Sequence, residues 1–326
     1  MKVLVTGAGG FLGRGVVSAL HRRGRSVRAL DLPGAGSRAA TSLPGVEEIH
    51  ADLLSSADLA AACQGVDAVI HLAALLSGDD AAVVTTAVEG TRRLLDAMTE
   101  AKVRRLVLAS SLSVYDWNAA EDLLDENSPL EPHPEARDAY TIAKLRQEQL
   151  SRDLCRRSGI TLTVLRPGML WGPGREYPST IGQDMGPVHL LFGAARQLPL
   201  VHVENCGDAF AAALEDPEEG GGTYNVIDHP DVTVSRFARD HLRRSGRAGV
   251  LIPVPYGPAM AVAAFVFRIT PIPLRRRLPG FVAPERFQAR YKALRVDGAR
   301  FREALGWSPP LSYDLCLERT FPCDAR

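Results

Sequence analysis

Cysteine is scarce in this 326-residue chain, and its arrangement excludes two classes of protein. There are five cysteines, an odd number at wide spacings, and no two of them form a CxxC pair. A disulfide framework or a zinc site needs paired or closely spaced cysteines, so neither is expected. A chain of this length also buries enough apolar surface to fold without such cross-links. We therefore predict reduced thiols, no metal site and a cytoplasmic location.

Net charge is missing as well, because 38 Lys and Arg residues are balanced by 38 Asp and Glu residues. This balance favours neither nucleic acid nor an anionic membrane as the main partner. Arg275, Arg276 and Arg277 form a local basic run, which we interpret as a solvated face. The expected partner is a small-molecule substrate.

Long hydrophobic runs are also absent. The longest covers nine residues, 259–267, whereas a membrane-spanning helix needs roughly 20. This segment fits a buried helix, a lid over the substrate or a shallow contact with a membrane, and the sequence leaves the three open. The apolar start of the chain ends at Gly7, which is too short for a secretory signal. No membrane span is therefore predicted.

The chain does contain a regular alternation of short apolar strands and helical patterns. Strands are expected at residues 3–5, 27–30, 46–49, 67–71, 105–109 and 161–165, and helices at 11–22, 85–101 and 136–158. Such an alternation predicts βαβ units and a parallel sheet with helices on both faces. The expected fold class is α/β, a Rossmann doubly wound parallel sheet.

Glycine and proline become frequent after Pro167, which indicates a change of organisation. We assign residues 1–170 to a Rossmann domain and residues 171–326 to a smaller C-terminal region. The two are expected to interleave near residues 199–227, because residues 201–203 have the character of a core strand.

A glycine-rich turn separates the first strand from the first helix. Its glycines are Gly7, Gly10 and Gly13. Glycine allows the tight turn, the approach of backbone to a pyrophosphate and the packing of helix on strand. The start of the helix then offers free N–H groups and a positive dipole end to the phosphates. The turn therefore predicts a dinucleotide cofactor. It makes residues 1–170 an NAD(P)-binding Rossmann domain and leaves residues 171–326 as the substrate-binding region.

Asp31 ends the second strand, 18 residues beyond Gly13. A carboxylate at this place accepts hydrogen bonds from the adenosine ribose hydroxyls. It also repels a 2′-phosphate, so NAD is favoured over NADP, although Arg14 and Arg38 could weaken this repulsion.

Three further residues suggest proton transfer. Tyr140 and Lys144 are four apart in a helical pattern, so they share a face. A nearby ammonium favours the phenolate and brings the tyrosine pKa toward the working range. Ser111 follows the fifth strand, where an α/β sheet opens its ligand crevice, and its hydroxyl can hold the reacting oxygen. We predict Ser111, Tyr140 and Lys144 as the catalytic residues.

Together these motifs resemble those of the extended short-chain dehydrogenases/reductases, the group also called the NAD-dependent epimerase/dehydratase family. The resemblance covers essentially the whole chain. The matching positions are 6–13, 31, 52–53, 71–74, 110–111, 114–115, 140, 144, 166–168, 172–174, 201–205 and 305–309.

The resemblance implies a cofactor site and an oligomeric state. The cofactor residues it implies are Gly7, Gly10, Phe11, Leu12, Gly13, Asp31, Asp52, Leu53, Ala73 and Lys144, with Asp52 and Leu53 beside the adenine and Lys144 at the nicotinamide ribose. The helices at 85–101 and 136–158 resemble those that pair in family homodimers. We interpret His71 as a core residue that braces the sheet.

Departures from the family pattern narrow the chemistry. Ala87 replaces the asparagine that is usual in the family. Members that catalyse dehydration resemble one another in having acidic residues just after the catalytic serine or threonine, and this chain has Leu112 and Ser113 there. An elimination needs an additional acid and base. Leu198 replaces the arginine that pairs with a nucleotide-sugar diphosphate, and Arg196 is out of register.

What remains is an NAD-dependent oxidoreductase that moves hydride between the nicotinamide and a secondary alcohol or ketone. The apolar segment 256–272 resembles that of the 3β-hydroxysteroid-dehydrogenase and ketoreductase-like branch. Two alternatives stay open. One is a nucleotide-sugar 4-epimerase, and the other is a protein that senses NAD without turnover.

Overall fold

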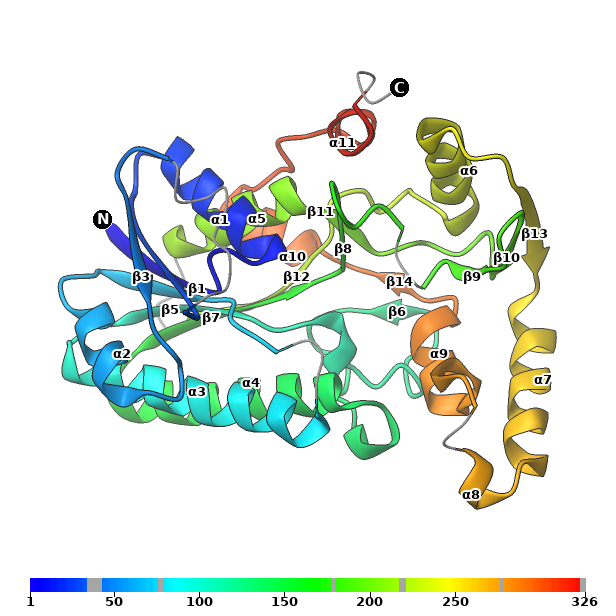
Figure 1. Ribbon diagram of the computed structural model, residues 1–326, viewed down its shortest axis with the longest axis horizontal. Coiled ribbons are helices and arrows are strands. Elements are labelled where there is room, and N and C mark those ends of the chain that lie inside the picture. Colours follow the sequence, from blue (N-terminus) through cyan, green and yellow to red (C-terminus); the bar gives the residue numbers. More distant parts are fainter. Residues whose placement is uncertain (34–42, 76–78, 178–179, 217–220, 276–277, 323–326) are drawn as a thin grey trace.

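A seven-stranded parallel sheet forms the centre of the computed structural model, which describes residues 1–33, 43–75, 79–177, 180–216, 221–275 and 278–322 (Figure 1). Arg38, Arg276 and Arg277 lie outside these ranges. The strand order is β12-β7-β5-β4-β1-β2-β3. The strands are β1 (Lys2–Thr6), β2 (Ser26–Asp31), β3 (Val46–His50), β4 (Ala68–His71), β5 (Arg105–Ala109), β7 (Thr161–Pro167) and β12 (Thr223–Val226). The predicted Rossmann fold class is confirmed.

The strand order reverses at β1, which sits between β2 and β4. Val5 of β1 pairs with Ala29 on one side and with Ile70 on the other. All three side chains are buried, as a parallel sheet covered on both faces requires. Ligands of open α/β sheets bind beyond the carboxyl ends of the strands at such a reversal.

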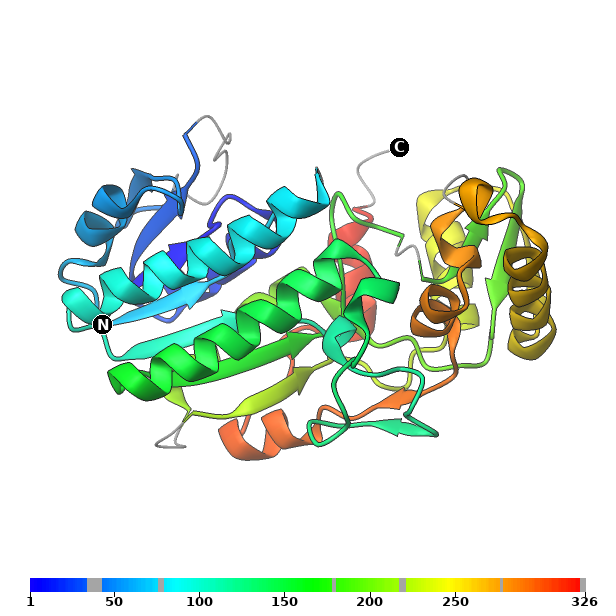
Figure 2. The ribbon, with the colours of Figure 1, turned by 90° about the horizontal axis from the view of Figure 1, so that it is seen from below.

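Helices cover both faces of the sheet (Figures 1 and 2). One face carries α1 (Phe11–Arg22) and α5 (Val203–Ala212), and the other carries α2 (Ser56–Cys63), α3 (Asp80–Glu100) and α4 (Ala139–Ser158). The caps explain where the two long helices begin. Asp79 accepts a hydrogen bond from the backbone N of Ala82, and Asp138 accepts one from Thr141. For that reason α3 starts five residues before the predicted position.

The later part of the chain returns to the central sheet. Strand β12 pairs with β7 at the sheet edge, and α5 packs on α1. The expected core strand at 201–203 needs correction. Strand β11 (Leu200–His202) pairs with β8 (Met169–Trp171) in a separate two-stranded sheet. Val203 already begins α5, because the side chain of His202 caps that helix at the backbone N of Glu204.

A smaller lobe lies at one end of the molecule, on the right in Figure 1. It contains a three-stranded sheet and the helices around it. These elements are β9 (Gly182–Asp184), β10 (Val188–Phe192), β13 (Val250–Val254), α6 (Val234–Ser245), α7 (Tyr256–Ile269), α8 (Ile272–Arg275) and α9 (Pro284–Tyr291). The remaining elements are η1 (Leu112–Val114), β6 (Leu123–Leu124), η2 (Pro134–Ala136), η3 (Ala213–Glu215), η4 (Gly280–Val282), β14 (Arg295–Val296), α10 (Ala299–Leu305) and α11 (Tyr313–Thr320).

The apolar segment 259–267 forms most of α7. Within α7 only Ala263 is buried, so the interpretation of this segment as a buried core helix is wrong. Among the residues that the structure describes, no helix has the length and apolar character needed to span a bilayer.

The packing of α1 on α5 yields a stability prediction. A Cβ added to Gly207 would lie 2.4 Å from the carbonyl carbon of Gly15, so the backbones must separate to admit it. We expect Gly207→Ala to lower the free energy of unfolding by about 1–3 kcal/mol, the usual effect of overpacking. Gly257 in α7 has no atom within 4 Å of an added Cβ. Gly257→Ala is the matched control and is expected to be neutral or slightly stabilising. Equal effects in urea denaturation would contradict the prediction.

Candidate active site

The turn between β1 and α1 is shaped to receive a phosphate. Gly7 has a φ of +70°, and a Cβ there would lie 2.9 Å from the Cα of Ala73. A Cβ at Gly13 would lie 2.1 Å from the carbonyl oxygen of Gly7, so both positions require glycine. No side chain caps the start of α1, and its first turn contains no acid. The N–H groups of that turn therefore fit a pyrophosphate.

A cleft of about 440 Å³ opens at this turn. It brings together every cofactor-binding residue predicted from the sequence, namely Gly7, Gly10, Phe11, Leu12, Gly13, Asp31, Asp52, Leu53, Ala73 and Lys144. Tyr140 and Ser110 also line it, whereas Ser111 is not among the lining residues. Ser111 lies at the start of η1, where its Oγ accepts a hydrogen bond from the backbone N of Ser113 at 3.1 Å.

Asp31 is buried at the end of β2 and is linked to the turn. Its Oδ2 accepts a hydrogen bond from the backbone N of Gly9 at 2.6 Å. Burial raises the pKa of Asp31, and the bond from Gly9 offsets part of that effect. The carboxylate therefore helps to fix the conformation of the glycine turn.

Helix α4 carries both Tyr140 and Lys144. The Nζ of Lys144 is buried and donates to the carbonyl oxygen of Ala109 at 2.6 Å and to Oε1 of Gln147 at 3.1 Å. It lies 5.9 Å from the centre of the Tyr140 ring. Burial lowers the pKa of Lys144 to about 8, although the charge of Glu148 acts in the opposite direction.

The expected effect of Lys144 on Tyr140 is not found. Burial raises the pKa of Tyr140, and the groups that lower it are Ser111, through a side-chain hydrogen bond, and Arg175, through its charge. The ammonium of Lys144 is directed instead to Ala109 and Gln147. In this structure Tyr140 is therefore a neutral phenol at physiological pH.

A buried chain of polar side chains extends from Lys144 into the sheet. Gln147 donates through Nε2 to Thr91 at 2.8 Å. Thr91 lies 2.9 Å from Nε2 of His71, whose Nδ1 lies 2.7 Å from Oγ1 of Thr6. Burial and the charge of Lys144 lower the pKa of His71 to about 3, so His71 is neutral. These hydrogen-bonded side chains connect α4, α3, β4 and β1, as the interpretation of His71 as a bracing residue requires.

A second buried network of hydrogen bonds and ion pairs includes Ser110, the residue before Ser111. Ser110 donates to Glu148 at 2.7 Å, and Glu148 also forms an ion pair with Arg166. The guanidinium of Arg166 lies 4.7 Å from the centre of the Tyr115 ring. Sequence reasoning did not identify Glu148, although its position four residues after Lys144 places it on the same face of α4.

The model of the NAD dependent epimerase/dehydratase family matches residues 3–226. The chain belongs to this family. It is an NAD(P)-dependent oxidoreductase or epimerase of the extended short-chain dehydrogenase/reductase type, as its resemblance to that group predicted.

Several curated relatives of this family member are reductases or dehydrogenases. Cinnamoyl-CoA reductase 1 of Oryza sativa subsp. japonica is 36% identical over 67% of this chain and 69% of its own length. The 3-beta-hydroxysteroid dehydrogenase of Mycolicibacterium neoaurum is 28% identical over 76% and 70%. The 4-hydroxy-2-methyl-3-oxo-4-farnesyl-3,4-dihydroquinoline-1-oxide ketoreductase of Stigmatella aurantiaca is 31% identical over 81% and 79%.

A solved structure agrees over nearly the full length. The short-chain dehydrogenase/reductase superfamily protein of Agrobacterium tumefaciens with bound NAD is 25% identical, with a TM-score of 0.71. The alignment covers 98% of this chain and 96% of that protein. The smaller lobe is therefore part of the shared architecture.

Arg175 lines the cleft of this epimerase/dehydratase-family member, and the sequence analysis did not identify it. Its guanidinium carbon lies 4.8 Å from the centre of the Phe11 ring. The available signal was an arginine directly after the loop Gly172-Pro173-Gly174, because loops at strand ends often contact ligands. Its charge is also one of the groups that lower the pKa of Tyr140.

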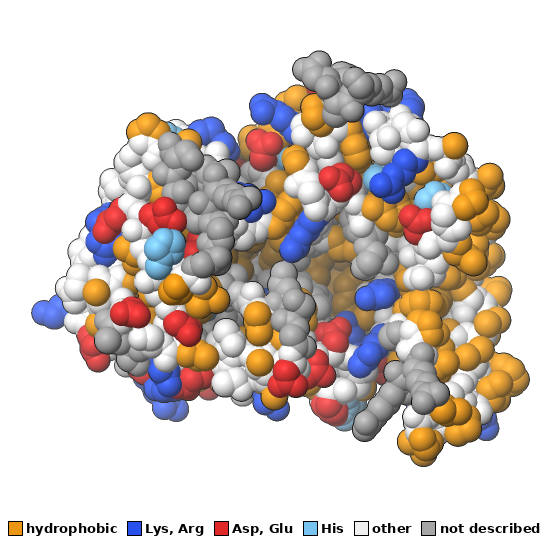
Figure 3. Space-filling view, in the orientation of Figure 1, with side chains coloured by type: hydrophobic (Ala, Val, Ile, Leu, Met, Phe, Trp, Pro, Cys, Tyr) orange, Lys and Arg blue, Asp and Glu red, His pale blue; other side chains and the backbone are white. Residues whose placement is uncertain are grey.

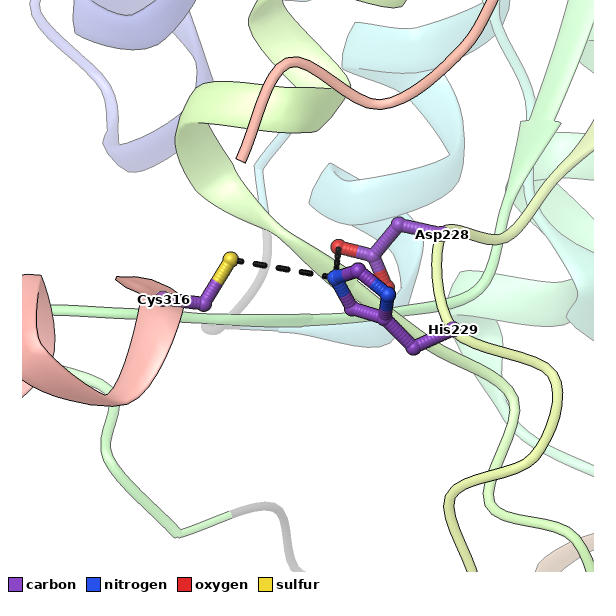
Figure 4. A group of neighbouring side chains, drawn as sticks. All are labelled: Asp228, His229 and Cys316. Carbon is purple, nitrogen blue, oxygen red and sulfur yellow. Dashed lines mark hydrogen bonds and ion pairs between the residues drawn. The ribbon is translucent and has the colours of Figure 1, made fainter. Parts of the chain in front are cut away.

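Asp228, His229 and Cys316 form a group outside this cleft (Figure 4). Their ligand atoms lie within 4.8 Å of one another. Oδ2 of Asp228 accepts hydrogen bonds from the backbone N of His202 and from Nδ2 of Asn205. Burial raises the pKa of the Cys316 thiol, which disfavours the thiolate that binds metals. We interpret the group as the contact that joins α11 to the start of α5.

The lowered pKa of Lys144 predicts a dependence of stability on pH. Below pH 8 Lys144 is protonated in both the folded and the unfolded protein, and its buried ammonium lowers the free energy of unfolding. Between about pH 8 and the usual value of 10.5 the unfolded chain binds a proton that the folded protein does not, so the free energy of unfolding rises with pH.

The measurement is the difference in unfolding free energy between the natural protein and Lys144→Met. It should grow by roughly 3 kcal/mol across that range. Lys102→Met, at an exposed position, controls for the loss of one positive charge. A difference that stays flat with pH would show that the assignment is wrong.

Proposed function

We propose that this protein reduces a ketone, or oxidises the corresponding secondary alcohol, of a small-molecule substrate. The observation that carries the proposal is the position of a partly buried, neutral Tyr140 at the cleft, with Ser111 hydrogen-bonded to it and Lys144 one helical turn away. A neutral phenol is the form that donates a proton to a carbonyl oxygen.

Each of these residues has a definite task in that proposal. The nicotinamide cofactor, when bound, supplies or accepts the hydride. Ser111 holds the substrate oxygen, and Tyr140 gives it a proton in reduction or takes one in oxidation. Lys144 binds a ribose hydroxyl and orients the cofactor. The glycine turn and Asp31 fit the cofactor's pyrophosphate and adenosine ribose.

The two positions that follow Ser111 offer no acid or base for an elimination. Leu112 is buried after Ser111, and Ser113 follows with a hydroxyl that has no hydrogen-bond partner among the described residues. Neither residue can act as the second acid or base that a dehydratase requires. This supports simple hydride and proton transfer.

A nucleotide-sugar 4-epimerase is less well supported, because the position of the diphosphate-binding arginine is apolar. Leu198 is fully buried in the core of the smaller lobe. Arg196 is also buried, and its guanidinium donates to the carbonyl oxygens of Phe192 and Thr180. Arg196 therefore braces the lobe and is not free to pair with a diphosphate. A protein that only senses NAD would not need the Tyr140 hydroxyl at all.

The names of the relatives point in the same direction. A reductase, a hydroxysteroid dehydrogenase and a ketoreductase are among them. We extend their type of chemistry, but none of their substrates, to this protein. We also propose a homodimer in which α3 and α4, adjacent on one face of the sheet, pair with the same helices of a second copy, and a cytoplasmic location.

NAD is the proposed cofactor, and Asp31 provides the test. Its buried carboxylate lines the cleft at the end of β2 and would repel a 2′-phosphate. We expect a lower dissociation constant for NAD than for NADP. Asp31→Ala should reduce the difference between these two dissociation constants. Glu48→Ala removes a nearby acid that is not a cleft residue. If Glu48→Ala reduces the difference between the two dissociation constants as much as Asp31→Ala does, the preference for NAD depends on the overall negative charge of this region and not on contact with Asp31.

The catalytic assignment is tested by Tyr140→Phe, which keeps the ring and removes the ionisable hydroxyl. Turnover should fall by roughly 100- to 10,000-fold, the usual range for losing general acid–base help, while NAD affinity stays nearly unchanged. Lys144→Met should weaken NAD binding, because Lys144 is assigned to the ribose, and should also reduce turnover. Ser111→Ala removes one hydrogen bond to the reacting oxygen and should reduce turnover less than Tyr140→Phe does, and the effects should not add.

Single-turnover hydride transfer, followed by the absorbance of the reduced nicotinamide over a panel of apolar ketones, is the measurement. Tyr256→Phe makes the same chemical change in the smaller lobe, away from the cleft residues, and should leave the rate unchanged. Hydride transfer by Tyr140→Phe at the natural rate would remove the basis of the proposal.

A further inference from the structure

Helix α7 presents large apolar side chains to solvent. Val262 and Phe265 are each 63% exposed, and Ile269 is 61% exposed. Their spacing of three and four residues puts them on one face of the helix. Ile272 in the next helix, α8, is 76% exposed and continues this surface. We call these four residues the apolar ridge.

The ridge is held on a firm base. On its opposite side α7 packs against α9 through Ala263, Met260 and Tyr256, which contact a cluster containing Phe287 and Tyr291. The exposure of the ridge is therefore not a result of a loosely attached helix. Exposed apolar patches of this kind mark sites of interaction.

The ridge also lies outside the cofactor cleft. None of its residues lines that cleft, and Figure 1 places α7 and α8 at the outer edge of the smaller lobe. Figure 3 shows apolar side chains gathered at the same edge. The exposed face therefore does not serve the substrate site as an inner wall.

The segment of sequence that contains the ridge has charge of almost one sign. Residues 243–295 contain 11 of the 38 Lys and Arg residues of the chain but only one of its 38 acids, Glu285. The formal charge of this segment is therefore +10, and that of the remaining chain is −10. The zero net charge of the whole protein conceals this separation.

Arginines stand directly beside the ridge. Arg268 is exposed in the last turn of α7, between Phe265 and Ile269. The guanidinium of Arg275 lies 4.5 Å from the centre of the Phe267 ring and donates to the carbonyl oxygen of Thr270. Long basic side chains at the border of an apolar face can reach lipid headgroups while the face enters the acyl region.

We propose that the apolar ridge docks this protein on the surface of an anionic lipid bilayer. The helix would lie in the plane of the interface with its ridge inserted about 5–10 Å, and Arg268 and Arg275 would bind acidic headgroups. Because α7 is too short to cross a bilayer, the contact is peripheral. A second copy of the chain fits the ridge less well, since Arg268 and Arg275 of the two copies would be brought together. This inference does not depend on the proposed reaction.

Vesicle co-sedimentation tests the proposal with the full-length protein. We expect binding to phosphatidylcholine vesicles that contain phosphatidylserine, weaker binding as salt rises, and little binding to phosphatidylcholine alone. Each basic residue near an anionic surface changes partitioning by about fivefold. Arg268→Glu with Arg275→Glu should therefore weaken binding by at least roughly 25-fold.

The apolar contribution is tested with Phe265→Ser combined with Ile269→Ser, which should also abolish most of the binding. Leu315→Ser on α11, where the natural side chain is 37% exposed, controls for loss of an exposed leucine. Arg22→Glu on α1 controls for charge reversal far from the ridge. Both controls should bind like the natural protein, and thermal unfolding followed by circular dichroism checks that every variant is folded.

Three results would overturn the proposal. The first is equal binding to neutral and acidic vesicles or no binding to either. The second is binding to soluble polyglutamate as tight as to vesicles and insensitive to the Phe265/Ile269 change, which would indicate an acidic protein partner. The third is a drop in mass by light scattering in the Phe265/Ile269 variant, together with no vesicle binding by the natural protein. That result would make the ridge a contact between copies.

Discussion

The buried ammonium of Lys144 is the constraint on which the arrangement of the site depends. An ammonium in an apolar interior is costly unless it is hydrogen-bonded, and Lys144 meets this need at Ala109 and Gln147. Ala109 ends β5, and Gln147 in turn contacts Thr91 of α3. Sheet, α3 and α4 must therefore meet in one register for the charge to be satisfied. The same register brings Tyr140, one turn earlier on α4, to the cleft.

How much of the site was predictable depends on how local each motif is. The glycine turn carries its own geometry in seven consecutive residues, so the sequence was enough to place it between β1 and α1. Tyr140 and Lys144 share a helix, and their common face follows from their spacing. The ion pair of Glu148 with Arg166 depends on how α4 packs on β7, and the pairing of β10 with β13 joins segments about 60 residues apart. No local pattern encodes such contacts.

The proton state of the site differed from expectation for a related reason. Sequence spacing places an ammonium near a phenol, but it does not show where the ammonium finds its hydrogen bonds. In the folded chain those bonds go to Ala109 and Gln147, and burial dominates the pKa of Tyr140. The result is a protonated tyrosine beside a lysine whose pKa is about 8. At neutral pH this combination is ready to donate a proton, which is the role that ketone reduction needs.

The net charge of the chain does not describe the charge of its separate regions. A bilayer or a partner responds to charges within a Debye length, about 8 Å at physiological salt, so the total of a chain says little about any one face. Here residues 243–295 are basic and the remainder is acidic by the same amount. Beside an anionic surface, such a molecule experiences a torque as well as an attraction. The basic segment 243–295 turns toward the surface, and α7, which lies within this segment, is the element that meets the surface. Orientation would then follow from charge, and insertion of the ridge would follow from the apolar area of α7 and α8.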